Sequence, residues 1–325
     1  MSPSPNRRHL LAAAALALAP WAARAQAAWP TRPVRIVVPY SAGGASDAPM
    51  RVIAQELSRQ LGQGVVVENK PGQGGLIGSE MVARAAPDGY TLLLASNPQT
   101  IGASLYAKLT FDPVEDFAPV SLFGREPSVL VVHPSLPVQT LQEFIAYVKA
   151  RPGQVNYASS GNGSAQHLFT AMLLSAAGLK MSHVPYRGSA PAVQDVVAGQ
   201  VPVAMPGLAA MVPYIREQRL RALAMTGTVR SPLLPSVPTL AESGFPGFSA
   251  YVWSGLVAPK GTPPAVIERL HRELAIALDA PAVKGFMEQA AIEQVTNSPT
   301  EMLAFMRQER ERSGKAVREA GLRVD

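Results

Sequence analysis

Short apolar runs rich in β-branched residues alternate with segments of helical periodicity along most of this chain. The runs predict strands near residues 34–39, 65–68, 90–95, 129–133, 155–158, 182–185, 220–225 and 254–258. Between them, apolar side chains recur at helical spacing, as in Met50, Ile53, Leu57 and Leu61. Strands that alternate with helices predict an α/β protein with mostly parallel sheets.

A weak internal repeat predicts two similar α/β lobes. In each copy a strand leads into a glycine-rich loop and a helix, and a second strand, loop and helix follow. The paired loop glycines lie 29 residues apart in the first copy (Gly43 and Gly72) and 27 apart in the second (Gly161 and Gly188). Segments 117–129 and 244–252 are rich in Pro, Gly and Ser. We expect the chain to pass between the lobes there, leaving the first lobe, completing the second and returning.

The N-terminal segment has the pattern of a secretory signal peptide. Arg7 and Arg8 precede an apolar run at residues 10–19, which is too short to span a bilayer, and Ala23 and Ala25 fit the cleavage rule. We therefore expect residues 1–25 to be removed on export across the membrane, by the general or the twin-arginine route. Loss of Arg7, Arg8 and Arg24 lowers the formal charge from +6 to +3, which argues against nucleic-acid binding.

Composition and motifs exclude several classes of site. The chain has no cysteine, so thiol nucleophiles, disulfides and zinc–thiolate sites are absent. No two histidines have the spacing of a helical metal pair, and no nucleotide-binding loop is present. We expect no metal and no cofactor. A secreted serine hydrolase acting through Ser160 or Ser164 with His167 is an alternative that rests on proximity in the sequence alone.

Four glycine-rich loops lie where an α/β fold binds ligands, beyond the carboxyl ends of the strands. They are residues 41–47, 72–78, 159–164 and 186–190. Glycine lets the backbone approach a ligand, and helix N-termini offer unpaired N–H groups and partial positive charge. Asp47 is either a helix cap or the partner of a ligand ammonium. Arg187 is either a bidentate carboxylate donor or one half of a surface ion pair.

Nine stretches of the mature chain match one known family of sequences, namely residues 29–35, 38–47, 66–72, 85–93, 151–153, 157–164, 183–188, 220–224 and 255–263. On these stretches, nearly all of the mature chain resembles the Bug family of periplasmic solute-binding proteins, the TctC-like receptors of tripartite tricarboxylate transporters. The resemblance implies a type II periplasmic binding protein, with two α/β lobes, a ligand cleft between them and two crossing strands. We place the first lobe at residues 26–125 plus 250–325 and the second at residues 126–249.

The resemblance also implies a small carboxylate ligand that turns of both lobes hold. The expected contacts are Ser41, Gly43, Gly44, Ser46, Asp47, Ser96, Asn97, Ser160, Gly161, Asn162, Gly163, Ser164, Tyr186, Arg187 and Gly188. The protein would be a monomer, would not be an enzyme, and would deliver its ligand to membrane transporter subunits. A ligand sensor for a membrane signalling kinase is the alternative.

Two segments depart from the family pattern. Ser41, Ala42, Ala45 and Ser46 replace residues of the usual first loop, and Pro206 and Gly207 stand where members often carry Asp and Asn. Loss of an acid there favours a plainly anionic or aromatic acid as the ligand.

Overall fold

The computed structural model describes residues 29–43, 46–106, 108–319 and 321–322. The chain divides into two compact units, Met1–Thr31 and Arg32–Asp325, and everything that follows concerns the second. The predicted signal peptide at residues 1–25 lies outside the described residues, as does Gly44. In the described part, no helix has both the length and the apolar character that crossing a membrane requires.

The first sheet has the strand order β2-β1-β3-β10-β4. Its strands are β1 (Val34–Val38), β2 (Val65–Asn69), β3 (Thr91–Ser96), β4 (Phe117–Pro127) and β10 (Tyr251–Pro259). The first three are parallel, whereas β10 runs antiparallel to both β3 and β4. Val37, Leu93 and Ala95 form one buried face, against which Val82 of α3 (Leu76–Ala83) and Met302 of α11 (Pro299–Glu319) pack.

The second sheet has the order β7-β6-β8-β5-β9 and is covered on both faces. Its strands are β5 (Val129–Val132), β6 (Asn156–Ser159), β7 (Ser182–Pro185), β8 (Val203–Ala204) and β9 (Arg221–Met225). Leu130 and Val132 face α5 (Leu141–Lys149) and α6 (Ala165–Ala177), whereas Val129 and Val131 face α7 (Ser189–Val197) and α8 (Leu208–Arg216). All four β5 side chains are therefore buried, which explains the uninterrupted apolar run.

The remaining helices belong to the chain around the first sheet. They are α2 (Asp47–Leu61), the short 3₁₀ helix η1 (Gln73–Gly75), α4 (Asn97–Leu105), α9 (Pro264–Asp279) and α10 (Pro281–Gln289). In α2 the side chains of Met50, Ile53, Leu57 and Leu61 are buried, as their spacing predicts.

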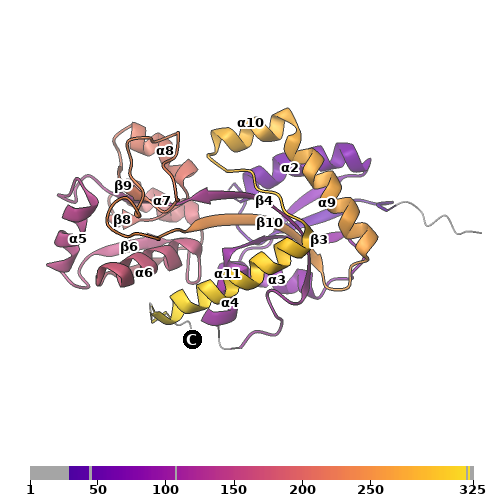
Figure 1. The fold of residues 1–325 in the computed structure, drawn as a ribbon, viewed down its shortest axis with the longest axis horizontal. Coiled ribbons are helices and arrows are strands. Elements are labelled where there is room, and N and C mark those ends of the chain that lie inside the picture. Colours follow the sequence, from indigo (N-terminus) through magenta and orange to yellow (C-terminus); the bar gives the residue numbers. More distant parts are fainter. Residues whose placement is uncertain (1–28, 44–45, 107, 320, 323–325) are drawn as a thin grey trace, which may run out of the picture. The chain divides into compact units, whose positions relative to one another are not determined.

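The two-lobed α/β fold is as predicted, but the prediction of mostly parallel sheets is wrong. Four of the eight strand pairings in the described part are antiparallel, namely those that β5 and β10 make. The physical reason is that the chain leaves one sheet on β4 and returns on β10. Figure 1 shows these two strands side by side between the sheets, paired from Tyr251–Pro127 to Pro259–Phe117.

The sequence placed residues 117–129 in a crossing segment, and most of it is the strand β4. Prolines 119 and 127 disfavour a central strand, but β4 is at the edge of its sheet, where proline is tolerated. The lobe limits at residues 125/126 and 249/250 stay a prediction, and both fall at the junction where β4 ends and β10 begins.

Candidate functional site

Six loops gather at the facing edges of the two sheets. Because parallel strands end at the same edge, β1, β2 and β3 bring together residues 39–43 with 46, residues 70–75, and residues 96–97. In the same way β6, β7 and β8 bring together residues 160–164, 186–188 and 205–207. All of the predicted site residues that the structure describes belong to these loops or to the first turn of the helix that follows. This is the edge at which open α/β sheets bind ligands.

The two sets of loops approach each other closely at glycines. A β-carbon added to Gly188 would lie 3.7 Å from the Ser41 hydroxyl oxygen, and one added to Gly74 would lie 3.0 Å from the carbonyl oxygen of Asn162. One added to Gly163 would collide with the Leu105 side chain at 2.6 Å. The described loops of the two lobes therefore face each other, with glycine at the closest approaches.

Asp47 is a loop anchor within the protein. Its side chain is 2% exposed, and its two oxygens accept hydrogen bonds from the Gly43 N–H (2.9 Å), Arg51 (2.8 Å) and Asn69 (2.8 Å). Burial alone would raise the pKa of Asp47, but these donors outweigh it and hold the pKa below its ordinary value. The side chain thus fixes the turn that presents Ser41 and Gly43, which are both exposed.

Ser96 and Asn97 use their side chains inside the fold. The Tyr40 hydroxyl donates to Ser96 Oγ at 3.2 Å, and burial raises the pKa of Tyr40 to about 12. Asn97 donates to the carbonyl of Tyr251 and accepts from the N–H of Trp253, both at 3.1 Å. Asn97 therefore joins α4 to the start of β10, one of the two strands that cross between the sheets.

The loop at residues 160–164 rests on two stacked imidazoles. The rings of His167 and His183 lie 3.9 Å apart and nearly parallel, at 7°. His167 Nδ1 accepts from the Gly163 N–H at 3.3 Å, and His183 Nε2 lies 2.6 Å from Ser159 Oγ. Burial lowers the pKa of both to about 4, with the neighbouring His183 adding to the effect on His167. The pair is therefore neutral at ordinary pH.

The Ser160–His167 and Ser164–His167 pairings that a serine hydrolase would use are not formed. Ser164 is the N-cap of α6, and its hydroxyl accepts from the His167 backbone N–H at 3.3 Å. The His167 ring bonds to Gly163 instead, and no hydrogen bond joins it to either serine within the described residues. Those residues also hold no cluster of acids and histidines suited to a metal ion.

Arg187 is an exposed cation in the 186–188 turn. It takes part in no ion pair or hydrogen bond with another described residue, so the predicted alternative of a surface ion pair is not found. Its neighbour Tyr186 is anchored, because its hydroxyl donates to Asp195 at 2.6 Å. Burial and the Asp195 carboxylate raise the pKa of Tyr186 to about 12. Gly188, at φ 125°, is the N-cap of α7 in a conformation that favours glycine.

Sequence reasoning missed two buried polar side chains at the Pro206–Gly207 position, Glu126 and Ser128. Glu126 is 6% exposed, and a β-carbon on Gly207 would lie 2.5 Å from its Oε1. The absence of a side chain at Gly207 thus leaves space for an acid from β4. Sequence distance hid this pairing, and the only signal was a lone acid, next to Arg125, in a stretch rich in Pro, Gly and Ser.

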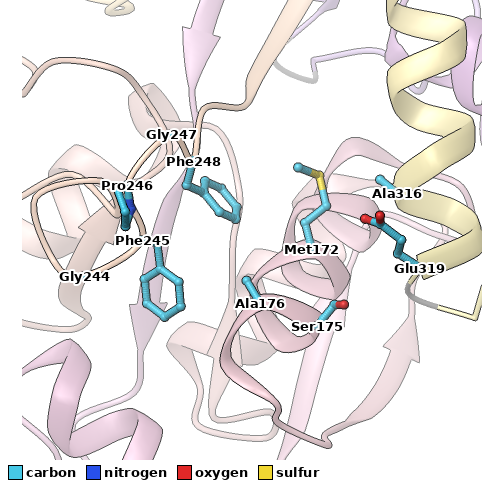
Figure 2. A pocket seen from close by; sticks show the side chains of 10 residues that line it. All are labelled: Met172, Ser175, Ala176, Gly244, Phe245, Pro246, Gly247, Phe248, Ala316 and Glu319. Atoms are coloured by element: carbon cyan, nitrogen blue, oxygen red, sulfur yellow. The ribbon is translucent and has the colours of Figure 1, made fainter.

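A cavity of about 470 Å³ lies away from the six loops. Figure 2 shows its walls, which come from α6, residues 244–248 and α11. They are Met172, Ser175, Ala176, Gly244, Phe245, Pro246, Gly247, Phe248, Ala316 and Glu319. None of these is a predicted site residue.

Two lobes with opposing loop edges, joined by paired crossing strands, define a bilobal solute-binding protein. The chain belongs to the TctC family, described as the tripartite tricarboxylate transporter family receptor, whose profile matches residues 50–322. BugT of Bordetella pertussis is 41% identical over 299 residues, which is 91% of each chain.

Comparison with solved structures also finds proteins of this kind. The periplasmic binding protein BugD superposes with a TM-score of 0.85 at 35% identity, covering 91% of this chain and all of BugD. Rpa4515 of R. palustris, solved with adipate, has a TM-score of 0.86 at 34% identity, over 91% of this chain and all of its own. The predicted membership of the Bug, or TctC-like, family is confirmed.

Proposed function

We propose that this protein captures a small carboxylate between its two lobes in the periplasm and delivers it to a tripartite tricarboxylate transporter. The observation that carries the proposal is the meeting of exposed Arg187 and the N-terminal turn of α7 with the exposed Ser41–Gly43 turn of the other lobe. An unpaired guanidinium and free backbone N–H groups are the donors that a carboxylate prefers. The adipate held by the related Rpa4515 supports the same ligand class.

We divide the predicted site residues into two groups, those that contact the ligand and those that hold the contacting groups in place. Ser41, Gly43, Ser160, Asn162, Arg187 and Gly188 offer accessible or partly accessible groups to the cleft. Asp47, Ser96, Asn97, Ser164 and Tyr186 make internal hydrogen bonds and hold those groups in place. No bond of the ligand is broken, so the activity is binding alone.

The two lobes close because the ligand binds the closed arrangement more tightly than the open one. A ligand that contacts both sets of loops binds the closed arrangement better, and shifts the population toward it. β4 and β10 are the elements that pass between the sheets and are where the motion is accommodated. The closed form is then the one that docks on the transporter. The protein acts as a monomer and reaches the periplasm through removal of residues 1–25.

A thermal-shift screen of the refolded mature protein against carboxylic acids tests the proposal. The panel contains adipate and its one-carboxylate counterpart hexanoate, tricarboxylates, amino acids and aromatic acids. A ligand at about 100 times its Kd adds ~2.7 kcal/mol to the unfolding free energy, which is readily detected. Refolding removes any ligand carried through purification. If no carboxylate stabilises the protein, the proposed ligand class is wrong.

A further inference from the structure

The helix α11 packs on the cores of both sheets. Near its start, Met302 and Met306 belong to the buried cluster around the first sheet, and near its end Ala316 and Val317 belong to a buried cluster around the second. Figure 1 shows this helix running toward α6, which it contacts. The cavity of about 470 Å³ lies at this contact, where the end of α11 meets α6 and the segment at residues 244–248.

The walls of this cavity are mainly apolar and aromatic. Figure 2 shows the phenyl rings of Phe245 and Phe248 on one side, with Met172 of α6 and the end of α11 on the other. Phe245, Phe248 and Met172 are partly buried and pack against the core of the second sheet. A volume of several hundred Å³, with aromatic walls and few polar groups, is typical of a site for a small molecule.

The loop that carries the two phenylalanines is held at both ends. Arg312 of α11 donates to the carbonyl oxygen of Ser249 at 2.7 Å, which joins the loop directly to the helix across the cavity. At the other end, Gln142 of α5 donates to the carbonyl oxygen of Ser243 at 3.3 Å. The walls are therefore fixed to each other by hydrogen bonds, and the cavity is a built feature of the fold.

The charge presented to the cavity is negative. Glu319 is the charged residue of its lining, and α6 and α11 both line it with their last turns, where the helix dipole is negative. Lys315 Nζ lies 3.8 Å from Glu319 Oε1, but the two side chains are 73% and 59% exposed, so this ion pair is weak. Arg318 and Lys180 also stand near these helix ends but do not line the cavity.

We propose that this cavity is a second binding site, separate from the ligand cleft, for a small amine with an apolar body. The apolar body lies between Phe245, Phe248 and Met172, where its surface is removed from water. The ammonium group lies against Glu319, and phenyl faces also attract a cation. The cleft presents the opposite charge through exposed Arg187, so the two sites select ligands of opposite sign. Binding of the amine does not depend on the carboxylate proposed for the cleft.

An NMR titration of the protein with isotope-labelled methionine methyl groups tests the proposal. The probes are phenethylammonium and phenethyl alcohol, which share the same apolar body and differ in charge. The Met172 methyl signal, assigned through Met172→Leu, reports on the cavity, and that of Met50, buried in α2, is the internal reference. We expect both probes to shift the Met172 signal saturably, with a Kd about fivefold lower for the amine. Added salt should reduce that difference.

Variants assign the binding to this cavity. Glu319→Gln should raise the Kd for the amine about fivefold and leave that for the alcohol unchanged, whereas Glu311→Gln, at an exposed position of the same helix outside the lining, should match wild type. Ala176→Trp fills the cavity from an exposed position and should abolish the shift, while Arg187→Ala should leave the amine affinity unchanged. A Met172 signal that neither probe shifts saturably would overturn the proposal. Equal affinities for amine and alcohol, or unchanged binding in a folded Ala176→Trp variant, would overturn it as well.

Discussion

At the scale of single residues, Arg187 is the position where the predicted ligand contact is most directly tested. Its side chain is exposed and bonds to no other described residue, so its loss should leave the fold unchanged. We expect Arg187→Ala to weaken a carboxylate ligand by roughly 1.5–3 kcal/mol, since charge-assisted hydrogen bonds of that strength would be lost. Isothermal titration of the variant measures this.

Arg151→Ala is the matched control for that substitution. Arg151 is an exposed arginine that follows α5 and lies outside the six loops. Its guanidinium lies over the Tyr147 ring, 4.1 Å from the ring centroid. Its removal should leave the Kd unchanged. Equal affinities for Arg187→Ala and wild type would make Arg187 a bystander in binding.

For Asp47 we expect a loss of folding stability, whereas for Arg187 we expect a loss of ligand affinity with the fold unchanged. Asp47→Asn removes the charge that accepts from Gly43, Arg51 and Asn69, and we expect unfolding to become easier by about 1.5–3 kcal/mol at pH 7. Since the pKa of Asp47 is lowered on folding, its contribution is present above the pKa of the unfolded chain and is lost as the pH falls. Urea unfolding at pH 7 and in acid measures both effects.

The control for Asp47→Asn is the same substitution at Asp279, an acid whose ion pair is exposed. Asp279→Asn breaks a pair with Lys284 at 2.9 Å, in which the Asp279 side chain is 78% exposed. Exposed pairs contribute at most about 1 kcal/mol, so this variant should unfold near the wild-type midpoint. A loss for Asp47→Asn no larger than that for Asp279→Asn would refute its role as the loop anchor.

At the scale of elements, the stacked histidines couple β7 to α6 and make the second lobe sensitive to acid. Both pKa values fall to about 4 on folding, chiefly through burial. Between pH 6.5 and 4 the unfolded chain thus binds more protons, and stability decreases as the pH is lowered. For one such histidine the loss reaches about 3 kcal/mol. Denaturant unfolding across this pH range should show the decrease.

His183→Gln tests whether the pair causes that slope. Glutamine at this position keeps a polar group near Ser159 Oγ but cannot become a second imidazolium against His167. We expect the variant to lose a large part of the wild-type pH dependence. A variant with the full slope would place the acid sensitivity in the carboxylates instead.

The elements were more predictable than the contacts between them. Runs such as residues 65–68 and 129–133 predict β2 and β5 to within a residue or two, because β-branched side chains buried in a sheet leave a local pattern. No local pattern predicts β8, because two residues are too short to form one. Glu126 was missed as a site residue for another reason. Its setting depends on pairing with Val252 and packing on Gly207, and no local pattern encodes either contact.

At the scale of the whole molecule, the two lobes meet at Ser41 and Gly188, and a reversible cross-link between them tests closure. The chain contains no cysteine, so Ser41→Cys combined with Gly188→Cys provides the only two thiols. A β-carbon at position 188 lies 3.7 Å from the Ser41 oxygen, near the geometry that a disulfide requires. The φ of 125° at Gly188 adds strain of about 1–3 kcal/mol, so the single variants must be shown to fold.

Because a ligand that touches both lobes favours the closed arrangement, we expect adipate to speed disulfide formation in this double variant, as measured by counting free thiols over time. Once oxidised, the protein should retain adipate that was bound beforehand and exclude adipate added afterwards, and reduction should restore exchange. Each single-cysteine variant keeps its thiol free, and its rate of ligand exchange is the reference for the double variant before oxidation. Thiols that stay free with and without ligand would mean that the two loops do not meet in solution. A cross-link that forms at the same rate in both conditions would mean that closure does not depend on the ligand.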